Sequence, residues 1–406
     1  MRITAAFTTA SLIAGAILAA ATTAIINSNT TARAQTTARA ETVARGQSEA
    51  EIEQIVRRHV QPMLIPAGGM AVALSIDGRT LFFNYGMADV ARKTPITSDS
   101  LFNLASIGKA FIATLLAQAV KQGEVSLDDP VAKYVTELQQ GGDIRKVTLG
   151  QLASHTSGLT RTPKQSEPDH RGPYTLPDFI RYLNAWQADE AHQPGQQDIY
   201  SNTGFVLLSL ALQRRFNMPI AQLMETRLLV PLGMTSTALP VPRANARGQL
   251  APELRRRAVQ GYNSDAQPVG EPGNQQGMFN WPGTGQMYSS ARDVARFLAA
   301  NLGALPDNAP LRDAMALAQQ GVFTVRPRFT QALAWQRVKN DGLELVDKNG
   351  GLNNTATYIG MIPKARLGIV ILSNCGGEPA TRIGRQIMLA LARSPALASE
   401  QGHRGE

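Results

Sequence analysis

Apolar positions recur along this chain first with a helical period and then in runs of strand length. Residues 49–64 carry apolar side chains three and four positions apart, which predicts an amphipathic helix. Residues 70–76 and 80–85 are apolar runs on either side of Asp77-Gly78. Because glycine accepts the positive φ that a tight turn needs, this second pattern predicts a β-hairpin.

A second helix is predicted at residues 106–122, where Phe111 and Leu115 share one face and Gly123 ends the pattern. The middle of the chain, residues 126–284, contains many Pro and Gly residues and few runs of strand type. It is therefore expected to consist of loops and helices.

Strand patterns return in the last part of the chain. They lie at residues 331–338, 343–347, 357–362 and 367–373, the last two forming a hairpin around Pro363. A closing helix is expected at residues 379–393. Strands from both ends of the chain, with helices between them, predict one sheet that is built from distant segments.

The expected fold class is therefore α/β (α+β). An antiparallel sheet built from N- and C-terminal segments is flanked by helices, and a mostly helical domain is inserted. The α/β domain combines residues 49–125 and 285–397, the helical domain covers residues 126–284, and residues 398–406 form a tail.

The first 34 residues have the pattern of a secretory signal peptide. A basic start at Arg2 is followed by an uncharged stretch at residues 3–26 and by Ala-Arg-Ala at residues 32–34, which is a small-x-small cleavage site. Ala-Arg-Ala occurs again at residues 38–40, so the cleavage site is not fixed. Residues 35–48 are polar and are expected to be a flexible lead-in.

An uncleaved membrane anchor is the alternative for this segment, because it is long enough to reach across a bilayer. Its many Ala and Thr residues make it only weakly hydrophobic, which favours cleavage. We expect a periplasmic or secreted protein with no stable membrane insertion after signal cleavage, and we expect a monomer.

Composition excludes several classes of protein. The 40 Lys and Arg residues outnumber the 31 Asp and Glu residues, but they are scattered and not interleaved with aromatics, so no nucleic-acid partner is expected. The single cysteine, Cys375, excludes an intramolecular disulfide and a cysteine-based metal site. The five histidines show no ligand spacing, and no metal or other cofactor is expected.

Three short motifs carry candidate chemistry, and the first is Ser106-Ile107-Gly108-Lys109. At the start of a helix, a spacing of three residues places Lys109 one turn above Ser106 on the same face. A hydroxyl is a weak nucleophile until a neighbouring base takes its proton, and a lysine amine can do so when burial favours its neutral form. The helix N-terminus also offers a backbone N–H where an oxyanion would form.

The second motif is Tyr200-Ser201-Asn202, which follows a Pro-Gly turn and precedes an apolar run. A tyrosine can serve as general base where ammonium groups favour its phenolate, and an asparagine amide can contact a substrate. Tyr182-Leu183-Asn184 has the same spacing, but apolar neighbours at helical spacing indicate that it packs in the core. For Tyr200 the alternative is a buried tyrosine with a satisfied hydroxyl.

The third motif is Lys348-Asn349-Gly350-Gly351, at the end of a predicted strand. A lysine there can hold negative charge on a substrate, and the two glycines allow backbone N–H groups to approach closely. An ordinary turn at a strand end is the alternative. The order of the three motifs, each in fitting local structure, favours a catalytic role over these structural alternatives.

This combination resembles the serine β-lactamases and penicillin-binding proteins, and most closely the class C β-lactamases. The resemblance runs from about residue 49 to residue 393. Outside the three motifs it includes Leu152–Leu159, Pro231–Ser236, Gln331–Trp335, Tyr358–Pro363 and Leu367–Asn374. The class A signature Ser-Asp-Asn is absent, and Tyr-x-Asn stands in its place.

The resemblance implies a role for each motif residue. Ser106 would be the acylated nucleophile, and Lys109 and Tyr200 would share its proton and later activate the deacylating water. Lys348 would supply electrostatic support. The backbone N–H groups of Ser106 and Gly351 would form the oxyanion hole.

The resemblance also implies binding residues for a small-molecule β-lactam substrate. Asn202 would contact the amide of its side chain, and the strand segment with Asn349 and Gly350 would border it. Arg382 falls where the family carries an arginine near the substrate carboxylate. His155 lies in a motif of the family that supports the site, and a structural role is expected for it.

Two departures from the family pattern concern substrate recognition. Asn349 replaces the threonine of the usual Lys-Thr-Gly motif, and Pro379 stands where an asparagine is frequent. A β-lactamase is therefore the main hypothesis, with the antibiotic resistance that this implies. A D-Ala carboxypeptidase, an esterase or a D-aminopeptidase of the same fold is the enzymatic alternative. A penicillin-binding sensor without turnover is a third alternative.

Overall fold

The computed structural model describes residues 48–163, 175–240, 250–273, 283–305, 308–377 and 379–394. The predicted signal peptide, almost all of the lead-in and the predicted tail lie outside these residues. Residues 55–393 form one compact unit, which contains the whole sheet and the sequence motifs. The other unit, residues 1–54 with 394–406, contributes the helical residues 48–54 to the described part.

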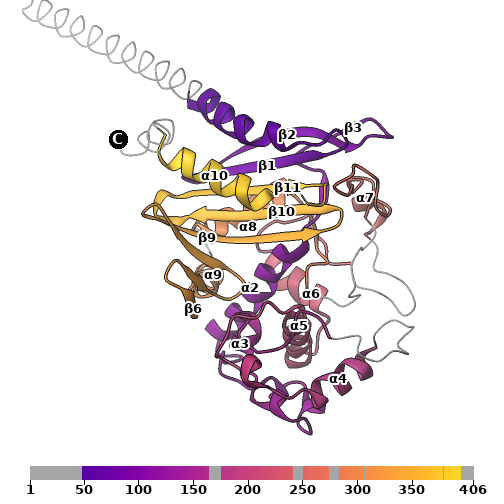
Figure 1. Cartoon of the computed structure of the whole chain (residues 1–406), viewed down its shortest axis with the longest axis vertical. Coiled ribbons are helices and arrows are strands. Elements are labelled where there is room, and N and C mark those ends of the chain that lie inside the picture. Colours follow the sequence, from indigo (N-terminus) through magenta and orange to yellow (C-terminus); the bar gives the residue numbers. More distant parts are fainter. Residues whose placement is uncertain are drawn as a thin grey trace, which may run out of the picture. The chain divides into compact units, whose positions relative to one another are not determined.

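A nine-stranded sheet, in the order β3-β2-β1-β11-β10-β9-β8-β7-β6, forms the centre of this unit (Figure 1). Every pairing in it is antiparallel. The strands are β1 (Gly69–Ile76), β2 (Arg79–Asp89), β3 (Thr94–Pro95), β6 (Phe323–Arg326), β7 (Phe329–Gln331), β8 (Gln336–Asn340), β9 (Leu343–Leu352), β10 (Thr355–Ile362) and β11 (Leu367–Ser373). Because β1 pairs with β11, the predicted union of N- and C-terminal strands in one sheet is confirmed.

The predicted hairpin at Asp77-Gly78 is present. Residue Ile76 of β1 pairs with Arg79 of β2, so the turn has two residues. Asp77 has a φ of 48° and Gly78 a φ of 84°. Two left-handed residues are typical of the type I′ turn, whose twist matches that of the flanking strands.

The strand predicted at residues 331–338 was wrong. β7 ends at Gln331 and β8 begins at Gln336, and Ala334 between them has a φ of 61°. The Gln331 side chain donates hydrogen bonds to the backbone carbonyls of Ala332 and Trp335, and Ala334 N–H donates to the carbonyl of Ala153. These contacts hold the buried Trp335 segment out of the sheet, which a local pattern could not indicate.

Helices cover both faces of the sheet. The helices are α2 (Gly108–Lys121), α3 (Leu149–Ala153), α4 (Leu176–Ala185), α5 (Asn202–Phe216), α6 (Ile220–Met224), α7 (Pro252–Arg255), α8 (Ala291–Asn301), α9 (Ala309–Ala318) and α10 (Ala380–Ala392). In Figure 1, α10 lies in front of β10 and β11, and α8 lies behind them. Leu298 of α8 packs on Gly368, whereas Met388 of α10 packs on Gly360, which faces the other way.

The short elements connect this framework. They are the 3-10 turns η1 (Gln61–Met63), η2 (Ala105–Ile107), η3 (Val131–Lys133), η4 (Thr136–Leu138), η5 (Asp143–Lys146), η6 (Glu190–His192) and η8 (Pro363–Ala365), the π turn η7 (Glu225–Leu229), and the two-stranded sheet of β4 (Leu101–Asn103) and β5 (Tyr288–Ser290). The described part of residues 126–284 contains helices and no named strand. The domain boundaries at residues 126 and 284 stay a prediction. In the described segments, no helix is long and apolar enough to cross a membrane.

Candidate active site

Ser106 lies in the turn η2, between strand β4 and helix α2. The residue before it, Ala105, has a left-handed φ of 48°, and its N–H donates to Asn103 Oδ1 at 2.9 Å. This turn makes the predicted helix begin at Gly108 and not at Ser106. The left-handed conformation of Ala105, which is sparsely populated for alanine, thus places the backbone of Ser106 at the N-terminal end of α2.

Lys109 is fully buried on the first turn of α2. Its Nζ lies 3.2 Å from Ser106 Oγ and 2.5 Å from the backbone carbonyl of Thr284. Burial, together with the positive charge of Arg161, lowers the pKa of Lys109 well below its usual value. The neutral amine is therefore favoured, and a neutral amine has a lone pair that can take a proton.

Tyr200 approaches Ser106 from another segment of the chain. Its hydroxyl donates a hydrogen bond to Ser106 Oγ at 2.6 Å. Two lysine amines and one guanidinium lie near its ring, at 5.2 Å for Lys109 Nζ, 5.0 Å for Lys348 Nζ and 5.4 Å for Arg161 Cζ, measured to the ring centroid.

His155 holds the segment that carries Tyr200. Its backbone carbonyl accepts from Ile199 N–H at 2.8 Å, and its Nδ1 accepts from Ser201 N–H at 3.1 Å. Its ring lies 4.4 Å from the Tyr200 ring, between centroids. Burial, with the charges of Lys348 and Lys109, lowers the pKa of His155 well below its usual value. A neutral His155 with Nδ1 as acceptor positions Tyr200, in keeping with the expected structural role.

Asn202 is the first residue of α5 and is half-buried. Ser201 is the N-cap of this helix, because its Oγ accepts from Gly204 N–H at 2.9 Å. The backbone N–H of Asn202 donates to the carbonyl of Arg161 at 2.9 Å. The Asn202 side chain therefore projects from the first turn of a capped helix, two residues after Tyr200.

Lys348 is buried on β9, and burial lowers its pKa, although Tyr200 opposes that shift. Strand β8 pairs with β9 only as far as Asp347, so β9 is paired on one side alone, by β10, from Lys348 onwards. A Cβ atom on Gly350 would lie 2.8 Å from Ser106 N, whereas a Cβ atom on Gly351 would meet nothing within 4 Å. Glycine at position 350 thus lets β9 pass directly beside the Ser106 backbone.

The chain is similar over most of its length to proteins of one family. A model of the family described as Beta-lactamase matches residues 56–392. The chain belongs to the beta-lactamase family.

Curated relatives agree with this assignment. The chain is 29% identical to a beta-lactamase of Escherichia coli (strain K12) over 365 residues, which is 80% of this chain and 89% of the relative. It is 27% identical to a beta-lactamase of Providencia stuartii over 359 residues, or 80% of this chain and 87% of the relative.

Solved structures agree as well. A class C beta-lactamase has a TM-score of 0.73 at 26% identity and covers 84% of this chain and 97% of its own. A D-alanine carboxypeptidase AmpC from Burkholderia cenocepacia has a TM-score of 0.70 at 29% identity, with 84% of this chain and 99% of its own covered. The expected fold class and serine hydrolase class are thereby confirmed.

In this member of the beta-lactamase family, Arg382 stands apart from the other predicted site residues. It is exposed on α10, and its guanidinium lies 3.3 Å from Met63 Sδ of η1. Within the described segments it forms no hydrogen bond with the other eight. Asn349 is exposed on β9, next to Lys348. The binding roles of Arg382 and Asn349 stay predictions.

Three residues that the sequence did not single out lie around the site. Arg161 is over the Tyr200 ring, and Thr284 contributes a carbonyl to Lys109. Asp198 is half-buried; burial raises its pKa, and the charge of Lys348 opposes that shift. Alternation in an extended segment could have suggested Asp198, two residues before Tyr200. A backbone carbonyl such as that of Thr284 leaves no residue-type signal.

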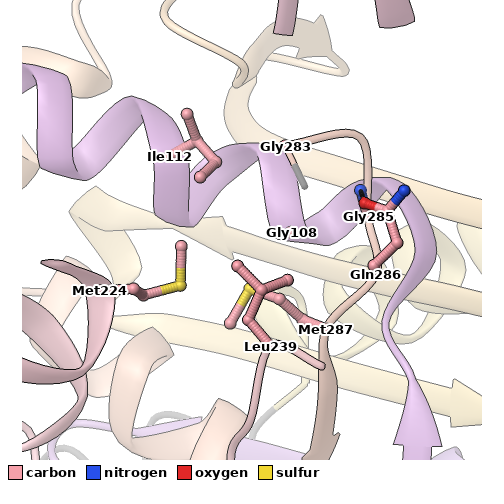
Figure 2. A pocket seen from close by; sticks show the side chains of 8 residues that line it. All are labelled: Gly108, Ile112, Met224, Leu239, Gly283, Gly285, Gln286 and Met287. Carbon is pink, nitrogen blue, oxygen red and sulfur yellow. Dashed lines mark hydrogen bonds between the residues drawn. The ribbon is translucent and has the colours of Figure 1, made fainter. Parts of the chain in front are cut away.

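Behind the first turn of α2, apolar side chains pack closely and leave no room for a water molecule. Figure 2 shows Ile112, Met224, Leu239 and Met287 in this region. A Cβ atom on Gly108 would lie 3.1 Å from Gly285 Cα. This side of the helix is therefore packed, and substrate is expected on the opposite side, towards Tyr200 and β9. The described residues hold no group of three or more His, Cys, Asp or Glu side chains arranged for a metal ion.

Replacing Lys109 by methionine is expected to raise the free energy of unfolding at pH 7 by about 1 kcal/mol, because a neutral apolar chain removes the cost of burying the amine. Between its lowered folded pKa and its unfolded pKa, Lys109 binds a proton only in the unfolded state, so the stability of the wild type rises with pH there. The stability advantage of the variant should shrink from pH 7 to pH 10.

Urea unfolding at both pH values measures this effect. Lys121→Met is the matched control, because Lys121 is an exposed residue in the last turn of the same helix. It should change stability by less than about 0.5 kcal/mol. A Lys109→Met protein that is less stable than the wild type, or an advantage that does not change with pH, would contradict the expectation.

Proposed function

We propose that this protein hydrolyses the amide of β-lactams through an acyl-serine intermediate, as a class C-like serine β-lactamase. The observation that carries the proposal is the position of Ser106 Oγ, 3.2 Å from a buried lysine amine and 2.6 Å from a tyrosine hydroxyl. Two groups that can exchange its proton thus touch the same oxygen. The relatives described above, which are beta-lactamases, support the same activity.

In the acylation step, Ser106 Oγ attacks the lactam carbonyl carbon and its proton passes to the Lys109–Tyr200 pair. The carbonyl oxygen becomes an oxyanion, for which the N–H groups of Ser106 and Gly351 are the proposed donors. The C–N bond then breaks, and the ring nitrogen takes the proton from Tyr200. The product of this step is an ester on Ser106.

In the deacylation step, a water molecule gives its proton to the same pair and attacks the ester carbonyl. The ester C–O bond breaks, Ser106 recovers its proton, and the opened β-lactam leaves as a carboxylic acid. No metal or other cofactor takes part in the proposed steps. Lys348 supports them by its charge beside Tyr200, 5.0 Å from the ring centroid.

Substrate binding is assigned to three regions around Ser106. Asn202, on the first turn of α5, is proposed to contact the amide of the acyl side chain. Asn349 and Gly350 lie on the part of β9 that is paired only by β10, and they are proposed to border the carboxylate on the ring of the substrate. Lys348 is proposed to supply the positive charge for this carboxylate. Arg382 is proposed to act at the same carboxylate from α10, although its guanidinium contacts Met63 in this structure.

A D-Ala carboxypeptidase is the second candidate function, because a structural neighbour at 29% identity carries the name D-alanine carboxypeptidase. Both activities acylate a serine in the same way. They differ in the rate at which water removes the acyl group, and a difference of a few kcal/mol in that barrier changes the rate by orders of magnitude. An esterase or D-aminopeptidase uses the same nucleophile with another leaving group.

The deciding experiment is a steady-state panel of penicillins, a cephalosporin, a carbapenem, a D-Ala-D-Ala peptide and a small ester, with the acyl-enzyme followed by intact mass. A β-lactamase turns over at least one β-lactam and shows a transient adduct on Ser106. Release of D-Ala or ester cleavage far faster than any lactam turnover would select the alternative enzymes. A persistent adduct without turnover would select a penicillin-binding sensor.

We also propose that the mature protein is periplasmic or secreted, acts as a monomer and confers antibiotic resistance. The pattern of residues 1–34 supports export. Growth of an expressing bacterium on a β-lactam, with and without those residues, tests export and resistance together.

A further inference from the structure

An unpaired cation lies at the edge of the proposed site. Arg161 is exposed, and among the residues that the structure describes its guanidinium forms no ion pair. Its Cζ is 5.4 Å from the centroid of the Tyr200 ring, and the hydroxyl of that ring touches Ser106 Oγ. One tyrosine ring thus separates the guanidinium from the nucleophile.

The backbone fixes Arg161 beside the acyl side of the site. Its carbonyl accepts from Asn202 N–H at 2.9 Å and from Thr203 N–H at 3.4 Å, so it is bound to the first turn of α5. Asn202 is the residue proposed to contact the acyl amide of the substrate. A group attached just beyond that amide would therefore come within reach of the guanidinium.

The basic side chains near Tyr200 differ in whether a carboxylate lies close to them. Lys109 and Lys348 are buried, and both lie near the ring. The half-buried Asp198 acts on Lys348. Arg161 thus contributes a positive charge that no carboxylate of the described residues neutralises. A planar guanidinium with free N–H groups matches a carboxylate in shape and in charge.

We infer that Arg161 is a specificity-determining residue that favours substrates whose acyl side chain carries a second carboxylate. This inference rests on the proposed function and names a substrate class for it. The carboxylate on the ring side of the substrate is assigned to β9, and the second carboxylate is assigned to Arg161. A substrate with an uncharged acyl side chain would leave the guanidinium in water, with no contribution to its binding.

The test compares benzylpenicillin with α-carboxybenzylpenicillin, which differ by one carboxylate on the acyl side chain. Acylation rate constants are measured by intact mass and kcat/KM by absorbance, for the wild type, Arg161→Gln and Arg161→Lys. Arg328→Gln is the matched control, because Arg328 is exposed in the turn between β6 and β7 and is assigned no role in the site. For each protein, the rate with α-carboxybenzylpenicillin, which has two carboxylates, is divided by the rate with benzylpenicillin, which has one. This ratio is the quantity compared between the proteins.

Arg161→Gln is expected to lower this ratio about fivefold, the scale of one partly exposed ion pair. Arg161→Lys should keep the ratio within about twofold of the wild type, since the charge remains. Arg328→Gln should leave it unchanged. In the wild type the ratio should fall as salt is raised to about 0.5 M, because salt screens an exposed pair.

An unchanged ratio in Arg161→Gln overturns the inference. An equal loss for both penicillins also overturns it, and shows that Arg161 acts through Lys109 and Tyr200. If the wild type is acylated but not turned over, hydrolysis as the function fails while the acylation ratio still decides the role of Arg161. If neither penicillin acylates Ser106, the proposed function and this inference fail together.

Discussion

Replacement of Ser106 by alanine is expected to lower kcat/KM for a β-lactam substrate by about 10⁵-fold, the scale on which serine hydrolases lose activity without their nucleophile. The reason is geometric: Lys109 Nζ and Tyr200 Oη both lie within hydrogen-bonding distance of the one oxygen that the substitution removes. No mass adduct should form on the variant with any penicillin. Steady-state kinetics and intact mass measure the two effects.

The matched control for this substitution is Ser264→Ala. Ser264 is exposed in the loop after Tyr262, and its hydroxyl makes no hydrogen bond to the described residues. The activity of the Ser264→Ala protein should equal that of the wild type. The Ser106→Ala protein should unfold at nearly the same denaturant concentration as the wild type, since one hydroxyl is lost. Turnover or adduct formation by Ser106→Ala at a tenth of the wild-type rate would refute the assignment of the nucleophile.

The second large effect concerns stability. Replacing Arg385 by methionine is expected to lower the free energy of unfolding by about 3–5 kcal/mol. Arg385 on α10 binds Asp347 with two hydrogen bonds, at 2.6 and 3.1 Å, and the Tyr358 hydroxyl donates to the same carboxylate at 2.8 Å. The Asp347 side chain is 1% exposed, so the variant would leave a buried charge without its cation.

Arg393→Met is the matched control for Arg385→Met. Arg393 is also paired with an aspartate, Asp341, but the side chains of this pair are 55% and 61% exposed. A solvated pair contributes about 0–1 kcal/mol, so this variant should remain close to the wild type in urea unfolding. Combining Arg385→Met with Asp347→Asn should recover part of the loss, because the amide has no charge to desolvate. Equal losses in the two single variants would contradict the expectation.

Loss of the contacts among Arg385, Asp347 and Tyr358 should also lower the activity. Asp347 immediately precedes Lys348 on β9, and successive residues of a strand face opposite sides of a sheet. The Arg385 side therefore holds β9 to α10, while the Lys348 side presents the charge to Tyr200. We expect Arg385→Met to lower kcat more than Arg393→Met does when the assay temperature approaches the unfolding transition.

Local patterns predicted the two hairpins and the helices near residues 49–64, 106–122 and 379–393, whereas α8 and α9 were not predicted. The turn at Asp77-Gly78 and the hairpin around Pro363 depend on neighbours in the chain, and both form as expected. The strand predicted at residues 331–338 was wrong, because the conformation of this segment depends on residues far away in the chain. Its apolar residues suit a strand, but the segment with the buried Trp335 is held by contacts with residues distant in sequence, such as the hydrogen bond from Ala334 N–H to the carbonyl of Ala153.

The sequence by itself determined the reactive groups: a Ser-x-x-Lys pair at the start of a helix, a tyrosine two residues before an asparagine, and a lysine before two glycines. Only the tertiary structure decided the rest. It buried Lys109 against the carbonyl of Thr284 and brought Arg161 over the Tyr200 ring. Residue type and spacing are local properties of a chain. The pKa of an amine and the charge around a phenol depend instead on burial by segments that meet only in the folded protein.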